Sequence, residues 1–382
     1  MTQKLYETDS YCKEFTATVL SCEKTDAGFE VILDKTAFFP EGGGQSADEG
    51  KIDGARVLDV QEKGGVVIHT LEAAIPQGKE VECKLDWELR FSRMQSHSGE
   101  HIVSGVVHSL FGYSNVGFHM SDALMTVDFD GALTPQDVEK VEILSNRAVY
   151  DNVKISASFP TEAEIETIDY RSKIQIGEGL RLITIEGVDC CACCAPHPAR
   201  TGEIGIIKIV NAYPYKQGTR VEMLAGICAL RDYVALNSAN KELMGLLSAA
   251  RQSVNEAVIR QNEQLSTLRA ENQQMSKKLA LSELNPQTVG EGAYSITKNL
   301  SYDELRHCAN SLQDSGAKTC VLLSSADEGY IYVVASKVRD VREIVKELNE
   351  KFQGKGGGKP DYAQGKLSGE AEELKKAVEE LL

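Results

Sequence analysis

The sequence predicts an α+β protein organised as four consecutive segments, and three observations lead to this prediction. Residues 1–90 alternate short apolar runs with turns rich in glycine, aspartate and lysine. Residues 231–284 contain no proline and a single glycine, whereas residues 285–382 mix strand and helix patterns. We therefore expect an N-terminal small β-barrel, an α+β core over residues 91–230, a long helical spacer and a C-terminal small α/β domain.

The first segment, residues 1–90, carries alternating runs that predict strands at Phe15–Leu20, Phe29–Leu33 and Gly65–His69. Between them lies Thr36-Ala-Phe-Phe-Pro-Glu-Gly-Gly-Gly-Gln45, which is too rich in glycine to continue a strand. We interpret it as a packed, shaped loop, because two phenylalanines and a proline precede the glycines. It is not a P-loop, since Gln45 stands where glycine is required and Ile52 replaces the required serine or threonine.

The second segment, residues 91–230, is expected to combine helices and short strands. A helical pattern runs from Trp87 to Phe111, and a second helix is expected over Pro135–Asn152 with Thr134 as its N-cap. Strands are expected at Leu124–Phe129, Leu180–Ile185 and Gly205–Val210.

Two short motifs in this core indicate a metal site. His97 and His101 stand four residues apart and project from one helix face, and Cys193 and His197 repeat that spacing. Three imidazoles and one thiolate suit Zn²⁺ better than calcium or magnesium, which prefer oxygen. Cys190, Cys191 and Cys194 are alternatives to Cys193. The string His97-Ser-Gly-Glu100-His101 also fits the H-x-x-E-H pattern of zinc peptidases, although those enzymes take a downstream carboxylate as third ligand.

Charge and cysteine usage limit the function classes. The net charge is −16, so a nucleic-acid partner has to be held by a local basic patch. Four of the ten cysteines crowd into residues 190–194, which favours metal binding over a disulfide framework. The first residues do not resemble a signal peptide and no apolar run approaches bilayer length, so we expect a cytoplasmic protein with no membrane partner.

The third segment, residues 231–284, contains a heptad seam with two polar interruptions. The seam residues are Val258, Gln261, Leu265, Leu268, Asn272, Met275 and Leu279. Two interpretations remain open: a helix packed on its own domain, or a coiled coil that forms a homodimer through residues 243–279.

The fourth segment, residues 285–382, has strand patterns at Thr319–Leu323 and Tyr330–Val334 and helix patterns at Val338–Phe352 and from about Ser368. The Gly354-Lys-Gly-Gly-Gly-Lys-Pro-Asp361 stretch is expected to be a loop. It is either a flexible linker or a phosphate-binding element, because bare backbone amides beside lysines suit a nucleic-acid backbone. Residues 336–359 carry seven basic and four acidic side chains, a local charge of +3.

These motifs together resemble the editing domain of alanyl-tRNA synthetase and its free-standing AlaX relatives, most closely the long AlaX form. The resemblance is carried by the glycine loop ending at Gln45, His97 and His101, Cys193 and His197 with Thr201-Gly-Glu-Ile-Gly205, and Lys216 with Arg220-Val-Glu222. The Gly354 stretch resembles the glycine-rich loop of a C-terminal domain shared with DHH-type phosphoesterases. One departure is that the family reads Cys-Gly-Gly-Thr-His where this chain has Cys193-Cys-Ala-Pro-His197.

The resemblance implies a β-barrel, an α+β zinc editing core, a helical spacer and a tRNA-binding C-terminal domain. The implied activity is hydrolysis in trans of tRNA(Ala) mischarged with serine, and of the glycine ester as a second substrate. It implies Zn²⁺ held by His97, His101, Cys193 and His197, with Thr36 reading the serine hydroxyl and Gln45 as a second polar contact.

Two further roles follow as expectations. Glu100 could act as general base, and the alternative is a solvated glutamate on the helix face. The tRNA-binding residues are expected to be Lys355, Gly356, Gly357, Gly358, Lys359 and Gln364. The alternative to a hydrolase is a non-catalytic protein that binds tRNA or dimerises and holds a structural zinc.

Overall fold

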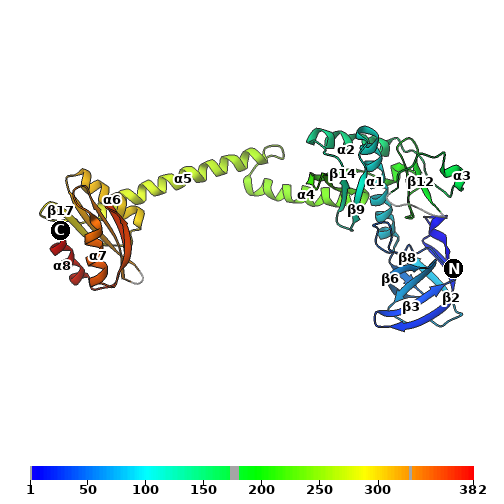
Figure 1. Ribbon diagram of the computed structural model, residues 1–382, viewed down its shortest axis with the longest axis horizontal. Helices are drawn as coiled ribbons and strands as arrows, with labels where there is room; N and C mark the ends of the chain where they lie inside the picture. Colours follow the sequence, from blue (N-terminus) through cyan, green and yellow to red (C-terminus); the bar gives the residue numbers. More distant parts are fainter. Residues whose placement is uncertain (1, 173–179, 327–328) are drawn as a thin grey trace. The chain divides into compact units, whose positions relative to one another are not determined.

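The computed structural model describes residues 2–172, 180–326 and 329–382. The chain forms two compact units, Met1–Glu242 and Leu243–Leu382 (Figure 1). The α+β class is confirmed, because both units combine helices with sheets. In the described parts, no helix is both long and apolar enough to cross a membrane.

The N-terminal part of the first unit is a closed six-stranded barrel with strand order β2-β3-β7-β6-β5-β8. Side chains alternate between the barrel core and solvent, as in β8, where Val81, Cys83 and Leu85 are buried. A short parallel pair, β1 (Gln3–Lys4) with β4 (Lys35–Thr36), leads into the glycine loop. The barrel strands are β2 (Glu14–Thr25), β3 (Gly28–Leu33), β5 (Gly50–Ile52), β6 (Ala55–Lys63), β7 (Val66–Leu71) and β8 (Glu80–Leu85).

Helix α1 (Trp87–Phe111) follows the barrel directly and carries the first pair of histidines. It begins where the Asp86 side chain accepts the Leu89 N–H, and it ends at Gly112, whose φ of 71° suits glycine. These local caps explain why both ends of the predicted helix are correct.

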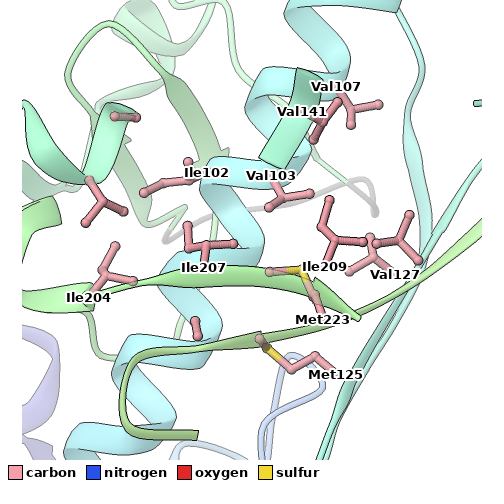
Figure 2. Close-up of a cluster of buried hydrophobic side chains, with 14 of the residues drawn as sticks. Ile102, Val103, Val107, Met125, Val127, Val141, Ile204, Ile207, Ile209 and Met223 are labelled. Atoms are coloured by element: carbon pink, nitrogen blue, oxygen red, sulfur yellow. The ribbon is translucent and has the colours of Figure 1, made fainter. Parts of the chain in front are cut away.

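Helix α1 is held against an antiparallel sheet and a second helix, α2 (Pro135–Tyr150). Figure 2 shows the apolar cluster between them, in which Ile102 and Val103 of α1 lie among Ile207, Ile209 and Met223 of the sheet. Thr134 and Asp137 cap α2 reciprocally, as its sequence predicts. The sheet has the order β14-β15-β10-β9, with β14 (Ile207–Tyr215), β15 (Gly218–Ala225), β10 (Met125–Phe129) and β9 (Asn115–Met120).

A small three-stranded sheet completes the first unit and positions the second pair of ligands. Its antiparallel order is β11-β12-β13, with β11 (Ile155–Ser158), β12 (Leu182–Ile185) and β13 (Asp189–Ala192). Cys193 follows β13 directly. Short helical turns lie at α3 (Glu162–Ile165), η1 (Leu5–Glu7) and η2 (Thr201–Ile204).

The predicted helical spacer is two helices, α4 (Gly226–Leu247) and α5 (Val254–Glu283). The turn between them includes Ser248 at a φ of 48°. Gly245 lies in the last turn of α4, but residues 248–253 contain no glycine or proline, so composition alone suggested uninterrupted helix.

The second unit contains a six-stranded sheet with helices on both faces. Val321 and Leu323 of β18 pack with α7 and α8, whereas Cys320 and Leu322 pack with α6 and the end of α5. The helices are α6 (Tyr302–Asp314), α7 (Val341–Lys351) and α8 (Ala371–Leu381). The sheet order is β16 (Gln287–Val289), β17 (Gly292–Lys298), β18 (Thr319–Ala326), β19 (Gly329–Ser336), β21 (Tyr362–Leu367), β20 (Lys355–Lys359).

The prediction of a loop at Gly354–Asp361 is wrong, because Lys355–Lys359 forms the edge strand β20. Its glycines allow a close approach to neighbouring groups. A Cβ on Gly356 would lie 2.2 Å from the Tyr332 hydroxyl, and one on Gly358 would lie 2.1 Å from the Tyr362 carbonyl oxygen. The glycines therefore serve packing as an edge strand, which their composition did not indicate.

Candidate metal centre

The four predicted ligands come together in the first unit. The donor atoms of His97, His101, Cys193 and His197 all lie within 4.8 Å of one another. Cys193 Sγ is 3.5 Å from His97 Nε2 and 3.4 Å from His197 Nε2. Tetrahedral zinc with ordinary bond lengths separates a sulfur and a nitrogen ligand by about 3.5 Å, so the donor set and its spacing fit zinc.

The outer nitrogen of each imidazole faces a polar partner from a different element. His97 Nδ1 lies 3.0 Å from Gln45 Oε1, and His197 Nδ1 lies 2.7 Å from Ser98 Oγ. His101 Nδ1 lies 3.3 Å from Asp189 Oδ2. With Nδ1 directed at these partners, each ring presents Nε2 to the centre of the cluster, which is how such partners orient metal ligands.

Asp189 is itself fixed by Arg171, whose Nε and Nη2 each donate to one carboxylate oxygen at 2.7 Å. Burial alone would raise the pKa of Asp189, but the contacts with His101 and Arg171 hold it below its ordinary value. His101, Asp189 and Cys191 form a second group of close donors. Since Arg171 occupies both oxygens of Asp189, we interpret this group as the outer support of the first site.

The electrostatics of the cluster select Cys193 among the crowded thiols. Burial alone would raise the pKa of Cys193, but His97, together with hydrogen bonds from His101 and His197, outweighs burial and holds this pKa well below its ordinary value. Burial raises the pKa of Cys191, and it raises that of Cys194 to about 11. Cys193 is therefore the thiol closest to the thiolate form that zinc binds.

The histidines differ in their proton affinity. Burial lowers the pKa of His197 to about 4, so this imidazole is neutral and ready to bind metal. Burial acts in the same direction on His101, but Asp189 outweighs it and raises the pKa of His101 well above its ordinary value. Metal binding at His101 is therefore expected to release a proton.

The glycine loop delivers Gln45 to His97. Gly42 and Gln45 exchange two backbone hydrogen bonds, of 3.0 and 2.9 Å, around a two-residue turn. Gly43 and Gly44 occupy that turn at φ values of 59° and 83°. A Cβ on Gly44 would lie 2.7 Å from the Phe118 ring, so this position needs glycine for its backbone angle and for space.

A cavity of about 620 Å³ opens onto the cluster. Its walls combine three of the metal ligands with the glycine turn, aromatic rings and charged side chains. Among the described residues that line it are His97, His101, Cys193, Gly43, Gly44, Glu100, Phe118, Phe159, Arg171 and Arg181. This size suits a small ligand or one nucleoside with its substituent.

Glu100 lines this cavity and is buried, so its interpretation as a solvated helix-face residue is wrong. Its Oε1 accepts a hydrogen bond from Ser104 Oγ at 2.5 Å and another from Asn115 Nδ2. The packing of α1 against β9, which begins at Asn115, removes this carboxylate from solvent.

Thr36 does not line the cavity as the structure describes it; it lies fully buried at the barrel end. Its Oγ1 is 2.9 Å from His69 Nε2 and accepts the Phe38 N–H at 3.1 Å. His69 Nδ1 faces the Val31 carbonyl oxygen and therefore carries the ring proton. His69 Nε2 then accepts a hydrogen bond from the Thr36 hydroxyl. The Thr36 hydroxyl is thus already hydrogen-bonded to His69 and Phe38. The geometry does not support the prediction that it recognises the serine hydroxyl of the substrate.

The predicted tRNA-binding residues lie at the sheet edge of the second unit, where Lys355, Gly357, Lys359 and Gln364 share one face and Gly356 and Gly358 lie on the other. Lys355, Gly357 and Lys359 pair with Lys366, Gln364 and Tyr362 of β21, and paired residues share a face. The Tyr362 hydroxyl donates to Gln364 Oε1 at 2.8 Å, and the Arg306 guanidinium lies 4.8 Å from the Tyr362 ring centroid. Lysines, an arginine and an aromatic ring on an exposed strand form a basic surface.

Not all of the basic side chains that give residues 336–359 a net charge of +3 are free to contact a nucleic acid. Lys337 pairs with Asp314, Arg342 with Asp340 and Lys351 with Glu380. The sequence count already included Asp340 but missed Asp314 and Glu380, which lie outside residues 336–359. It also missed Arg306 and Lys366, because the fold brings them to this surface.

Several residues of the metal centre were also missed. Asp189 and Ser98 are close in sequence to predicted ligands, so a search for polar neighbours of those ligands could have found them. Arg171 and Arg181 carry no spacing signal, because the three-stranded sheet places them.

Comparisons with known proteins agree with this arrangement in the same order along the chain. Residues 8–89 match the family model of tRNA synthetases class II (A). Residues 180–222 match that of the threonyl and alanyl tRNA synthetase second additional domain. Residues 290–382 match the DHHA1 domain.

Whole-chain relatives are similar over nearly the full length. Alanyl-tRNA editing protein Aarsd1 of Mus musculus is 29% identical, over 95% of this chain and 94% of that protein. Alanyl-tRNA editing protein AlaX-L of Pyrococcus horikoshii is 28% identical, over 98% and 96%. Alanine–tRNA ligase of Ignicoccus hospitalis is 30% identical over 95% of this chain, which spans only 41% of the ligase. The ordered family matches and the near full-length similarity show that the chain belongs to the family of alanyl-tRNA editing proteins.

Proposed function

We propose that this protein is a zinc-dependent trans-editing hydrolase that cleaves the ester bond of tRNA(Ala) mischarged with serine, with the glycine ester as a second substrate. The observation that carries the proposal is the zinc-type donor set in the wall of a cavity large enough for an aminoacylated nucleoside. The near full-length relatives are named alanyl-tRNA editing proteins, which supports an editing activity in general.

The chemistry asked of the protein is modest, because an aminoacyl ester is already activated. A zinc ion held by His97, His101, Cys193 and His197 would polarise the ester carbonyl or fix the substrate. Glu100 lines the cavity beside the two α1 histidines, with its Oε1 held by Ser104 and Asn115. In the proposed reaction Glu100 takes the proton of the attacking water and returns it to the ribose oxygen that leaves when the ester C–O bond breaks.

Gln45 supplies the proposed discrimination between serine and alanine. Its Oε1 faces His97, whereas its Nε2 is buried and has no hydrogen-bond partner among the described residues. A serine hydroxyl can accept this N–H and an alanine methyl cannot, and a site that hydrogen-bonds a hydroxyl rejects analogues that lack it. Gln45 does not line the cavity either, but it contacts His97, which does, and its Nε2 is unpaired, whereas both hydrogen-bonding sites of the Thr36 hydroxyl are occupied. Gln45 therefore replaces Thr36 as the proposed reader of the hydroxyl.

The second unit is proposed to bind the tRNA body. Lys355, Lys359 and Gln364 present cations and an amide on the open face of β20 and β21, and Gly357 exposes backbone there. Gly356 and Gly358 contribute by letting the strand pack closely against its neighbours. Such a surface suits phosphate contacts, which position a nucleic acid without reading its sequence.

One observation favours a second candidate, a tRNA-binding or dimerising protein with a structural zinc. Four protein ligands usually mark a closed structural zinc site. A zinc peptidase is not favoured, because the third and fourth donors are a cysteine and a histidine, and among the described residues no downstream carboxylate belongs to this donor set.

The experiment that separates the candidates is serine release by the Glu100→Gln variant. We expect zinc content and melting temperature to stay near wild type, while the rate of seryl-tRNA(Ala) hydrolysis falls by about 10²–10⁴. Glu139→Gln, at an exposed glutamate of α2, is the matched control. If zinc-loaded wild type releases no serine at all, the scaffold interpretation replaces the hydrolase.

A further inference from the structure

Arg181 is a buried cation in the cavity wall that the proposed chemistry leaves unused. Its side chain is 9% exposed, and Nη1 donates to the carbonyl oxygens of Cys193 at 3.0 Å and Ala195 at 2.8 Å. Its Nε is buried and has no hydrogen-bond partner among the described residues. A buried guanidinium that lacks an acceptor costs free energy, so a ligand that supplies one is favoured.

The other cations of the cavity are already neutralised. Lys4 pairs with Glu62 at 2.7 Å, and Arg171 is held by Asp189. Arg181 makes no ion pair with any described carboxylate, so it is the cation of this wall whose charge remains available. An anionic group on the ligand is therefore the matching chemistry.

Phe159 is an exposed aromatic ring in the same cavity lining. It follows β11 and is 53% exposed, so its ring is accessible to a ligand in the cavity. A solvent-accessible ring near a free cation is the combination that binds a nucleobase next to its phosphate.

The cavity also has room beyond the amino acid. Arg181 lines both the main cavity and a neighbouring recess of about 230 Å³, whose walls include Thr8, Ser10 and Ser156. Arg181 therefore borders space on two sides, one of them the cavity at the metal centre.

We propose that Arg181 and Phe159 form the subsite for the 3′-terminal adenosine of the charged tRNA. Arg181 Nε donates to an oxygen of the 5′-phosphate of this nucleoside, and Phe159 stacks on the adenine. This subsite rests on the proposed function, because it assumes that the aminoacyl group lies at the metal centre.

The test is equilibrium binding of two probes that cannot be hydrolysed, 3′-serylamido-3′-deoxyadenosine with and without a 5′-phosphate, to the zinc-loaded full chain. We expect wild type to bind the phosphorylated probe about tenfold or more tightly than the other, since charge-assisted hydrogen bonds are strong. Arg181→Met abolishes that preference.

Phe159→Ala is expected to weaken both probes by about tenfold, since a base–aromatic stack contributes about 1–3 kcal/mol. Phe159→Trp restores the affinity. Arg147→Met and Tyr150→Ala, at exposed positions of α2, are matched controls that leave both affinities unchanged.

Equal wild-type affinity for the two probes would overturn the phosphate contact, and this comparison needs no variant, even if Arg181→Met loses its zinc or fails to fold. Unchanged binding by Phe159→Ala would overturn the stack. If the probes bind as expected but seryl-tRNA is not hydrolysed, the subsite stands and the hydrolase proposal fails. If seryl-tRNA is hydrolysed but phosphate gives no preference and Phe159→Ala has no effect, the hydrolase proposal stands and the subsite fails.

Discussion

Each imidazole of the metal cluster is aimed by one side chain, and these side chains come from the glycine loop, from α1 and from β13. Gln45, Ser98 and Asp189 therefore fix ring orientation before any ion binds. Of the three, Asp189 is further fixed by Arg171, which donates a hydrogen bond to each of its carboxylate oxygens.

Replacing Asp189 by Asn is expected to weaken zinc binding by about 10–100-fold, because the charge that supports His101 is lost. Competition with a chromophoric chelator measures the affinity directly. Asp128→Asn removes a similar carboxylate held by Arg220 outside the cluster, so it serves as the control. Equal zinc affinity in the two variants would show that Asp189 does not support the metal site.

His69 gives the barrel a specific dependence on pH. Burial lowers the pKa of His69 to about 4, so between this value and about 6.5 the unfolded chain is protonated while the folded one is not. The unfolded state then binds more protons, and stability is lost as pH falls through this window. By pH 5 we expect a loss of about 2 kcal/mol.

Urea unfolding of wild type and His69→Gln at pH 7 and pH 5, followed through the single tryptophan Trp87, measures this contribution. The metal cluster titrates equally in both proteins, so their difference isolates His69. His108→Gln, at an exposed histidine, controls for loss of an imidazole. A difference that does not change with pH would contradict the expected role of His69.

At the scale of elements, the glycine turn between β4 and β5 joins the barrel to the metal site. Gly44 has a φ of 83°, and a Cβ there would meet the Phe118 ring. Gly54 has nearly the same φ, 82°, but nothing lies within 4 Å of its added Cβ. Substitution of Gly54 therefore tests the backbone angle alone, whereas substitution of Gly44 tests the same angle together with a steric clash.

Gly54→Ala is expected to cost about 1 kcal/mol through backbone strain alone. Gly44→Ala should cost more and should also reduce zinc affinity, because the displaced turn withdraws Gln45 from His97. Thermal melting and zinc competition measure the two effects. Equal behaviour of the two variants would show that the approach to Phe118 is unimportant.

Helix α5 exposes its heptad seam, with Leu265 45% and Leu268 61% exposed in the single chain. If residues 243–279 form the predicted homodimer, this seam is covered by a second copy. Replacing both leucines by Glu is expected to yield a monomer in light scattering, whereas Ser266→Glu, outside the seam, leaves the dimer intact. A wild-type monomer at micromolar concentration would remove the dimer prediction.

Local signals account for the elements that the sequence predicted well. The ends of α1 follow from Asp86 and Gly112, and the start of α2 follows from the Thr134 capping box. Strand β20 and the break after Leu247 depend on tertiary contacts or lack a marker residue, so composition misassigned them. In the site, the spacing of His97 and His101 on α1 was enough to predict that they are ligands. The sequence did not show that Thr36 would be buried away from the cavity, because this depends on the tertiary path of the loop.

At the scale of the whole molecule, the chain carries a net charge of −16. Lys355, Lys359 and Lys366 nevertheless lie together at the edge of the six-stranded sheet of the second unit. Because the net charge is negative, tRNA binding relies on local cations such as these, so it should weaken steeply with salt. The first unit holds the proposed ester-cleaving site, and the second holds the proposed tRNA-binding surface.

The most direct measurement is the single-turnover rate of deacylation of seryl-tRNA(Ala), glycyl-tRNA(Ala) and alanyl-tRNA(Ala) by the zinc-loaded protein, repeated after chelation. We expect fast release of serine, slower release of glycine, alanyl-tRNA spared, and loss of serine release when zinc is removed. Release of alanine as fast as serine, or full activity without zinc, would contradict a zinc-dependent editing site that selects the serine hydroxyl.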